Sequence, residues 1–116
     1  MEERGFAEFS SAELDVGYNY AIDKFHEQIT RETLRIAGNQ AGAIFKAKRE
    51  KQEQCNPRQA ATEALRGYCR RNHLSMTVYR FNAYVCGIAK MFSERNPQTV
   101  AKRNRERVLA ELKAAS

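Results

Sequence analysis

The sequence has few of the residues that interrupt helices or build extracellular scaffolds. Its 116 residues include 2 prolines, 6 glycines, 3 cysteines and no tryptophan. So little proline and glycine argues against a collagen-like or low-complexity chain. Three cysteines cannot all pair within one chain, which favours a reducing compartment over a disulfide framework.

Long apolar runs are also absent. No segment approaches the ~20 apolar residues of a membrane span. The opening residues Met1 to Arg4 are acidic and lack the apolar core of a secretory signal. We therefore expect no membrane association and a cytoplasmic location. Hydrophobic residues still make up 42% of the chain, which predicts a single globular domain at this length.

The net charge is +6, and the charged residues are distributed unevenly along the sequence. Residues 1–32 carry 8 acidic and 3 basic side chains, and residues 33–116 carry 6 acidic and 17 basic ones. The pattern indicates an acidic N-terminal element and a basic remainder that could meet phosphates. The alternative is that the basic residues only solvate helix faces.

The N-terminal half has the pattern of a long helix. Ser10 and Glu13 have the spacing of a capping box, which predicts a helix start. An apolar stripe at helical spacing follows, consisting of Leu14, Tyr18, Ala21, Ile22, Phe25, Ile29 and Ile36. We expect a flexible acidic terminus over 1–10 and a long helix over 11–54. Gly38 and Gly42 mark either a break in that helix or a close helix contact.

Three further helices are expected over 57–72, 75–94 and 97–114. Asparagine followed by proline is a helix start signal at Pro57 and again at Pro97, and Ser75 is placed to cap the middle helix. The predicted fold is all-α: a single helical domain over 11–116, with a long N-terminal helix followed by a three-helix unit over 57–114. The N-terminal helix would pack within the chain or form a homodimer.

Residues 87–107 carry a pattern of two helices around a short polar turn. Ile88-Ala89 lies on the first helix, and Thr99-Val100 opens a second helix rich in bases. The segment resembles helix-turn-helix DNA-binding proteins, in which the second helix enters a DNA groove. The resemblance implies nucleic-acid contacts by Gln98, Thr99, Lys102, Arg103, Arg105 and Arg107. The alternative is an ordinary helix pair packed in the core.

A second basic cluster surrounds Arg70 and Arg71. Arg66 and Arg80 could add to it, and Tyr68, Tyr79 and Tyr84 lie nearby in the sequence. Guanidinium groups mixed with aromatic rings are typical of single-strand and RNA binders. The alternative is that these tyrosines are partly buried core residues.

Signs of catalysis or metal binding are sparse. Cys69 and His73 are four residues apart and could share a helix face, but no Cys-x-x-Cys pair supports a zinc site. No phosphate-binding glycine loop or nucleophile motif occurs. We expect no enzyme, no cofactor and no metal. The favoured function is binding of nucleic acid, DNA rather than RNA, as a transcriptional regulator. The alternative is a non-enzymatic adaptor or inhibitor, of the kind mobile elements encode, that binds a protein partner.

Overall fold

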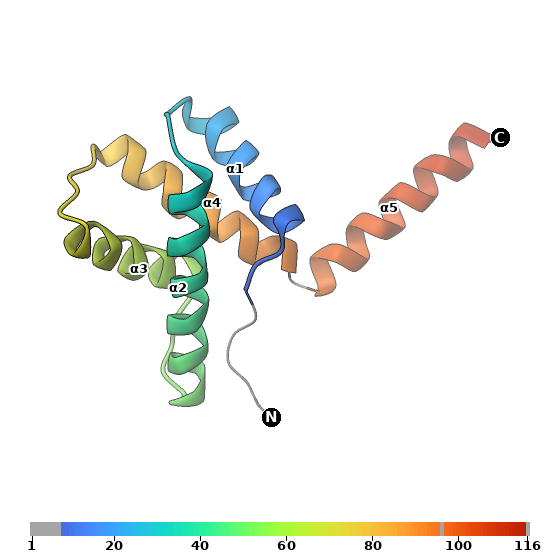
Figure 1. Cartoon of the computed structure of the whole chain (residues 1–116). Helices are drawn as coiled ribbons and strands as arrows, with labels where there is room; N and C mark the ends of the chain where they lie inside the picture. The colour runs from blue at the N-terminus through green and yellow to red at the C-terminus, as the bar shows by residue number, and fades with distance from the viewer. Residues whose placement is uncertain (1–7, 96, 116) are drawn as a thin grey trace.

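The structure is a computed structural model that describes the backbone of residues 8–95 and 97–115 and the side chains of residues 8–95 and 105–114. All regular secondary structure in these ranges is helical, which confirms the all-α expectation. The helices are α1 (Ser11–Phe25), α2 (Arg31–Glu50), α3 (Pro57–Arg71), α4 (Val78–Arg95) and α5 (Pro97–Ala115). Helices α1 to α4 form one body, from which α5 projects (Figure 1).

The expected long helix over 11–54 is wrong, because the chain breaks between α1 and α2. The predicted capping box is present: the Ser10 hydroxyl accepts the Glu13 N–H at 3.1 Å, and the Glu13 carboxylate accepts the Ser10 N–H at 2.8 Å. At the other end of α1, His26 takes a left-handed conformation with φ 56°. Thr30 then caps α2 by accepting the Thr33 N–H at 3.2 Å. Ile29 therefore lies between two helices.

Gly38 and Gly42 do not interrupt α2. At Gly38 the structure instead shows a close helix contact, the other possibility that the sequence offered. A Cβ atom on Gly38 would lie 3.0 Å from Cε of Met91. Met91 belongs to α4 and is completely buried. The missing side chain at Gly38 therefore lets Met91 pack directly against α2.

Helix α3 begins where the sequence predicts, and α4 does not. Asn56 and Gln59 form a second capping box, with side chain to backbone distances of 2.9 and 3.0 Å. Ser75 is not the cap of α4. Thr77 has that role, since its hydroxyl accepts the Arg80 N–H at 3.1 Å. Both residue types can cap, so sequence alone did not distinguish them.

Helix α4 is the centre of the body and packs against every other helix. The largest fully buried side chains are Leu34, Leu65, Ile88 and Met91, from α2, α3 and α4. Helix α5 contacts only α4 within the described residues. None of the described helices has the length and apolar character that a bilayer crossing needs.

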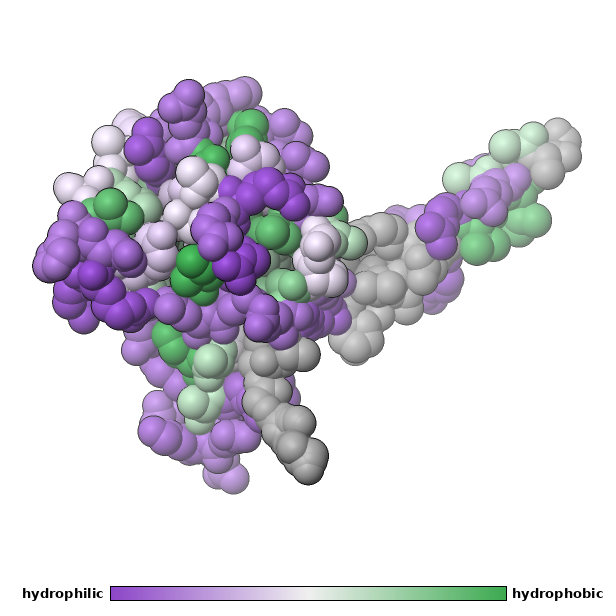
Figure 2. All heavy atoms as spheres, in the orientation of Figure 1, coloured by the Kyte–Doolittle hydropathy of each residue, from purple (hydrophilic) through white to green (hydrophobic). Residues whose placement is uncertain are grey.

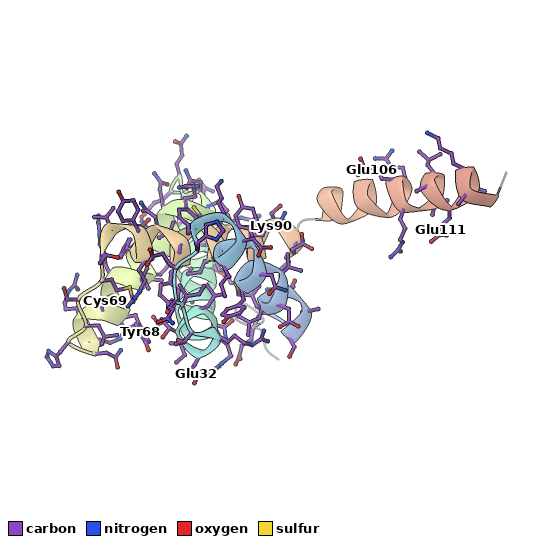
Figure 3. All side chains as sticks on the ribbon, turned by 90° about the horizontal axis from the view of Figure 1, so that it is seen from above. Glu32, Tyr68, Cys69, Lys90, Glu106 and Glu111 are labelled. Atoms are coloured by element: carbon purple, nitrogen blue, oxygen red, sulfur yellow. The ribbon has the colours of Figure 1, made fainter. Side chains whose placement is uncertain are left out.

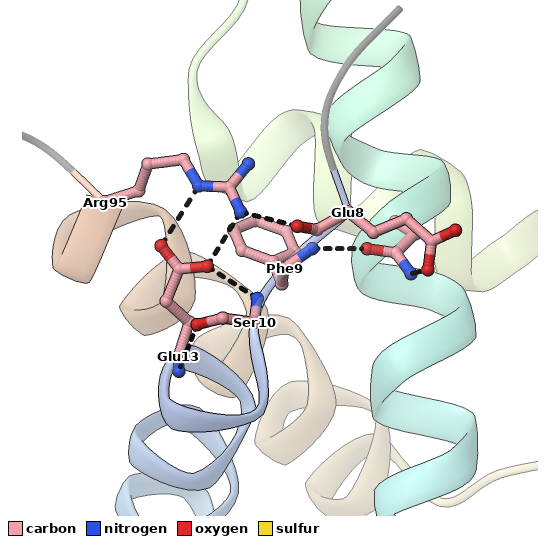
Figure 4. Close-up of polar contacts among 6 residues, drawn as sticks. Glu8, Phe9, Ser10, Glu13 and Arg95 are labelled. Atoms are coloured by element: carbon pink, nitrogen blue, oxygen red, sulfur yellow. Dashed lines mark hydrogen bonds and ion pairs between the residues drawn. The ribbon is translucent and has the colours of Figure 1, made fainter.

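A polar clamp joins the segment before α1 to the end of α4 (Figure 4). Arg95 donates to both carboxylate oxygens of Glu13, at 2.7 and 3.1 Å, and to the Glu8 carbonyl at 2.9 Å. Its guanidinium also lies 4.3 Å from the ring centre of Phe9. Phe9 is buried, so residues 8–10, which the sequence analysis assigned to a flexible terminus, pack against the body in the structure. Residues 1–7 lie outside the described part.

Candidate nucleic-acid interface

A row of arginines runs along the exposed side of α3. Arg58, Arg66 and Arg70 are eight and four residues apart, so they share one face of the helix. The rise of ~1.5 Å per residue places them over about 18 Å of helix. The opposite side of α3 is buried through Ala60, Ala61, Ala64 and Leu65. Burial of this apolar side fixes which way the arginine row faces.

The positive charge of this arginine row is not neutralised. Within the part of the chain that the structure describes, none of the three guanidinium groups makes an ion pair or hydrogen bond. The acid on α3, Glu63, binds Lys48 of α2 at 3.2 Å, and this contact raises the pKa of Lys48. The row therefore presents unpaired donors that suit phosphate oxygens.

The row borders an open groove between α3 and the end of α2, with a volume of about 870 Å³. Its lining is mostly polar and consists of Lys48, Gln54, Asn56, Arg58, Gln59, Thr62, Glu63, Arg66 and Arg70. The amides and the Thr62 hydroxyl add neutral hydrogen-bonding groups beside the guanidinium groups. Side chains of these types supply most backbone contacts in protein–nucleic acid complexes.

Several other bases on the body pair with acids. Arg31 pairs with Asp15, Arg35 pairs with Glu32 at 2.8 Å, and Lys90 pairs with Glu94 at 3.9 Å. The contact with Glu32 also raises the pKa of Arg35. These pairs leave little net charge at their positions. Lys24, Arg49 and Lys51 also have no ion pair among the described residues, so what sets the arginine row apart is that three unpaired guanidinium groups lie along one helix.

The two basic residues predicted at the end of α3 differ in their surroundings. Arg70 belongs to the arginine row. Arg71 is exposed, but its guanidinium donates to the side chain of Gln40 on α2 at 2.6 Å. Arg80 was a further candidate for this cluster in the sequence analysis. Its Nε atom lies 3.9 Å from a carboxylate oxygen of Glu27. Arg71 and Arg80 are therefore engaged within the body.

The tyrosines near this cluster do not form one stacking surface. Tyr84 is buried and its hydroxyl accepts the Thr30 N–H at 2.9 Å. The Tyr68 hydroxyl lies 3.3 Å from the Thr33 hydroxyl. Tyr79 is exposed. Two of the three tyrosines thus connect α3 and α4 to the start of α2. This agrees with the alternative that these tyrosines are partly buried core residues.

The predicted residues on α5 are far from the α3 row. Arg105 and Arg107 are exposed. Gln98, Thr99, Lys102 and Arg103 lie on α5, and their side chains fall outside the described ones. The described residues show no packing between α3 and α5. Helix α3 is part of the body, and α5 projects from the body on a different side (Figures 1 and 3). The structure thus places the predicted residues on two separate helices, α3 and α5.

The arrangement of α4 and α5 differs from a helix-turn-helix. Helix α4 continues to Arg95 and α5 begins at Pro97, which leaves one residue between them. The motif uses a turn of about three or four residues, which folds its second helix back on the first. Helix α5 instead projects away from the body (Figure 1). The resemblance over 87–107 remains a prediction from the sequence.

Sequence reasoning missed Arg58 as a site residue. The signal was present, since Arg58, Thr62, Arg66 and Arg70 repeat every four residues through a helix whose start was predicted correctly. Among the described residues, no group of three or more potential metal ligands occurs. Comparison with protein-family models, curated proteins and solved structures finds no match for this chain.

Proposed function

We propose that the protein binds nucleic acid and that the arginine row of α3 contacts the phosphate backbone. The observation that carries this proposal is the set of three unpaired guanidinium groups on one helix face. Phosphate contacts of this kind position a protein on a strand without reading its sequence. Each neutralised phosphate releases counterions, so binding would be strongly salt-dependent.

Duplex DNA is the favoured ligand, as expected from the sequence. The arginine row extends over about 18 Å of α3 while turning partly around the helix, so it can contact successive phosphates of one strand. The α5 bases, including Arg105 and Arg107, would supply a second contact surface. A role as a transcriptional regulator further requires base reading, for which Gln98 and Thr99 remain the sequence-predicted candidates.

The test compares two triple variants in fluorescence anisotropy with labelled duplex DNA and structured RNA. One variant changes Arg58, Arg66 and Arg70 to alanine. The control changes Arg31, Arg35 and Lys46, which face acids in the structure, and removes the same charge. We expect the first to weaken binding by about tenfold or more at ~100 mM salt and the control to weaken it far less. Equal losses would show that only net charge matters and would contradict the assignment.

One observation supports the alternative of a non-enzymatic adaptor or inhibitor. Helix α5 exposes the large apolar residues Val108, Leu109 and Leu112. An exposed apolar face of this kind is typical of protein–protein contacts. An adaptor would keep its partner when the three α3 arginines are changed, and would lose it when these apolar residues are truncated.

A further inference from the structure

Glu63 is the acidic residue of α3, and it lies beside the arginine row. It belongs to the lining of the groove next to that row, and hydrophilic side chains gather on the surface over the end of α3 (Figure 2). Glu63 precedes Arg66 by three residues, whereas Arg58 and Arg70 are five and seven residues away. Side chains three residues apart are neighbours on a helix surface, and acids pair with bases at this spacing. Arg66 is therefore the member of the row that Glu63 could neutralise.

The chain contains the same spacing on α2, and there the ion pair forms. Glu32 and Arg35 are also three residues apart. Arg35 donates to both carboxylate oxygens of Glu32, from Nε at 3.1 Å and from Nη2 at 2.8 Å. Arg66 makes no such contact with Glu63 and no other ion pair within the described part of the chain. The spacing alone therefore does not decide whether an arginine is neutralised.

The difference between the two sites is Lys48, which approaches Glu63 from α2. The Lys48 ammonium nitrogen is 3.2 Å from a Glu63 carboxylate oxygen. Hydrogen bonding to Glu63, followed by its charge, raises the pKa of Lys48. Glu32, in contrast, pairs with a single base among the described residues, Arg35. Because the Glu63 side chain is 55% exposed, its carboxylate has room to turn toward another base if Lys48 is removed.

We propose that Lys48 is a positioning residue, which holds the Glu63 carboxylate away from Arg66 and so leaves that guanidinium group available for phosphate. The side-chain arrangement stands on the contacts above, and its role in binding rests on the proposed function. Without the Lys48 ammonium group, Glu63 pairs with Arg66 as Glu32 pairs with Arg35. The arginine row then presents two unpaired guanidinium groups instead of three.

Nitrogen-15 NMR of the Arg66 Nε–H group tests the arrangement in the absence of nucleic acid. Lys48→Met keeps the aliphatic stem and removes the charge. We expect the Arg66 Nε–H resonance to shift and its exchange with water to slow, because the guanidinium group becomes hydrogen-bonded to the Glu63 carboxylate. Neither change should occur when Lys48→Met is combined with Glu63→Ala, which removes the acceptor.

Lys46→Met is the matched control for the NMR measurement. Lys46 is also on α2 and pairs with Glu50 at 3.7 Å, so its loss should leave the Arg66 resonance unchanged. An Arg66 Nε–H group with the same chemical shift and exchange rate in Lys48→Met as in the parent would overturn the proposal.

The salt dependence of duplex DNA affinity tests the role of Lys48 in binding. In the parent, Arg66→Ala should reduce the slope of log affinity against log salt concentration by about 0.9 in magnitude, the contribution of one neutralised phosphate. In the Lys48→Met protein, where Glu63 neutralises Arg66, the same substitution should change the slope far less. Adding Glu63→Ala to Lys48→Met should restore the reduction of about 0.9.

Two results would contradict this role, and they differ in meaning. If Arg66→Ala reduces the slope by about 0.9 in the Lys48→Met protein as well, Arg66 still contacts phosphate there and Lys48 does not position Glu63. If the parent does not bind duplex DNA, the proposed function and the binding role fail together. The NMR of Arg66 decides the side-chain arrangement in either case.

Discussion

Gly17 and Gly87 meet where α1 crosses α4, with backbone against backbone. A Cβ atom on Gly17 would lie 2.6 Å from the Gly87 carbonyl oxygen and 2.5 Å from Cγ of Met91. The reciprocal distance, from a Cβ on Gly87 to the Gly17 carbonyl oxygen, would be 3.1 Å. The crossing therefore requires two residues without side chains and fixes how closely α1 approaches the central helix.

Gly17→Ala is expected to destabilise the fold by about 1 to 3 kcal/mol, because the new methyl overlaps a backbone oxygen that cannot move freely. Gly67→Ala is the matched control. There the nearest atom, at 2.9 Å, is the end of the flexible Arg71 side chain. Alanine should stabilise α3 by up to ~1 kcal/mol at that half-buried helix position, because the Arg71 side chain can move aside. Urea unfolding followed by circular dichroism measures both, and equal effects of the two substitutions would contradict the close crossing.

The Arg95–Glu13 clamp should make stability pH-dependent. Hydrogen bonding from Arg95 holds the pKa of Glu13 below its ordinary value of 4.5. A carboxyl with a lowered folded pKa contributes stability above 4.5, and this contribution is lost as the pH falls through the folded pKa. With side chains 30% and 19% exposed, the pair is partly protected from solvent.

Glu13→Gln should therefore cost about 1 to 2 kcal/mol at pH 7, and the difference from the parent should shrink toward pH 3. The measurement is the free energy of unfolding of both proteins at several pH values. Glu32→Gln is a useful comparison, because its partner Arg35 is solvent-exposed and the pair should contribute little. A difference between Glu13→Gln and the parent that persists unchanged at pH 3 would argue against the ion pair as its cause.

Tyr84 links α4 to the start of α2 through one hydrogen bond. Tyr84→Phe keeps the buried ring and removes the acceptor of the Thr30 N–H, so it should destabilise the fold by about 0.5 to 1.5 kcal/mol. Tyr79→Phe removes a hydroxyl from a ring that is 71% exposed and should be neutral. Thermal unfolding of the two variants checks this contrast, and a neutral Tyr84→Phe would show that the hydrogen bond does not stabilise the fold.

Local capping signals explain how much of the fold could be predicted. Ser10 with Glu13, and Asn56 before Pro57, make hydrogen bonds within one helical turn, so the sequence alone predicted those starts correctly. The break at His26 was missed because a left-handed non-glycine residue has no strong sequence signal. The Thr30 cap was also missed, since the residue three positions on is Thr33 and cannot complete a capping box.

The candidate site, like the fold, could be predicted from the sequence only in part. The spacing of Arg58, Arg66 and Arg70 is visible in the sequence, but their lack of acidic partners depends on which residues the folded chain brings near them. The spacing of Val108, Leu109 and Leu112 on one side of α5 is likewise visible in the sequence. Whether another helix covers that side depends on how elements far apart in the sequence pack together. The periodicity of the sequence carries no information about that packing.

The most direct test of the nucleic-acid proposal is the dependence of duplex DNA affinity on salt, measured by anisotropy between about 50 and 200 mM. For the parent, the logarithm of the association constant should fall linearly with the logarithm of the salt concentration. Changing Arg58, Arg66 and Arg70 to alanine should reduce the magnitude of that slope by about 2.7, or about 0.9 for each phosphate that the variant no longer neutralises. An unchanged slope, or no binding by the parent at the lowest salt, would contradict the proposal.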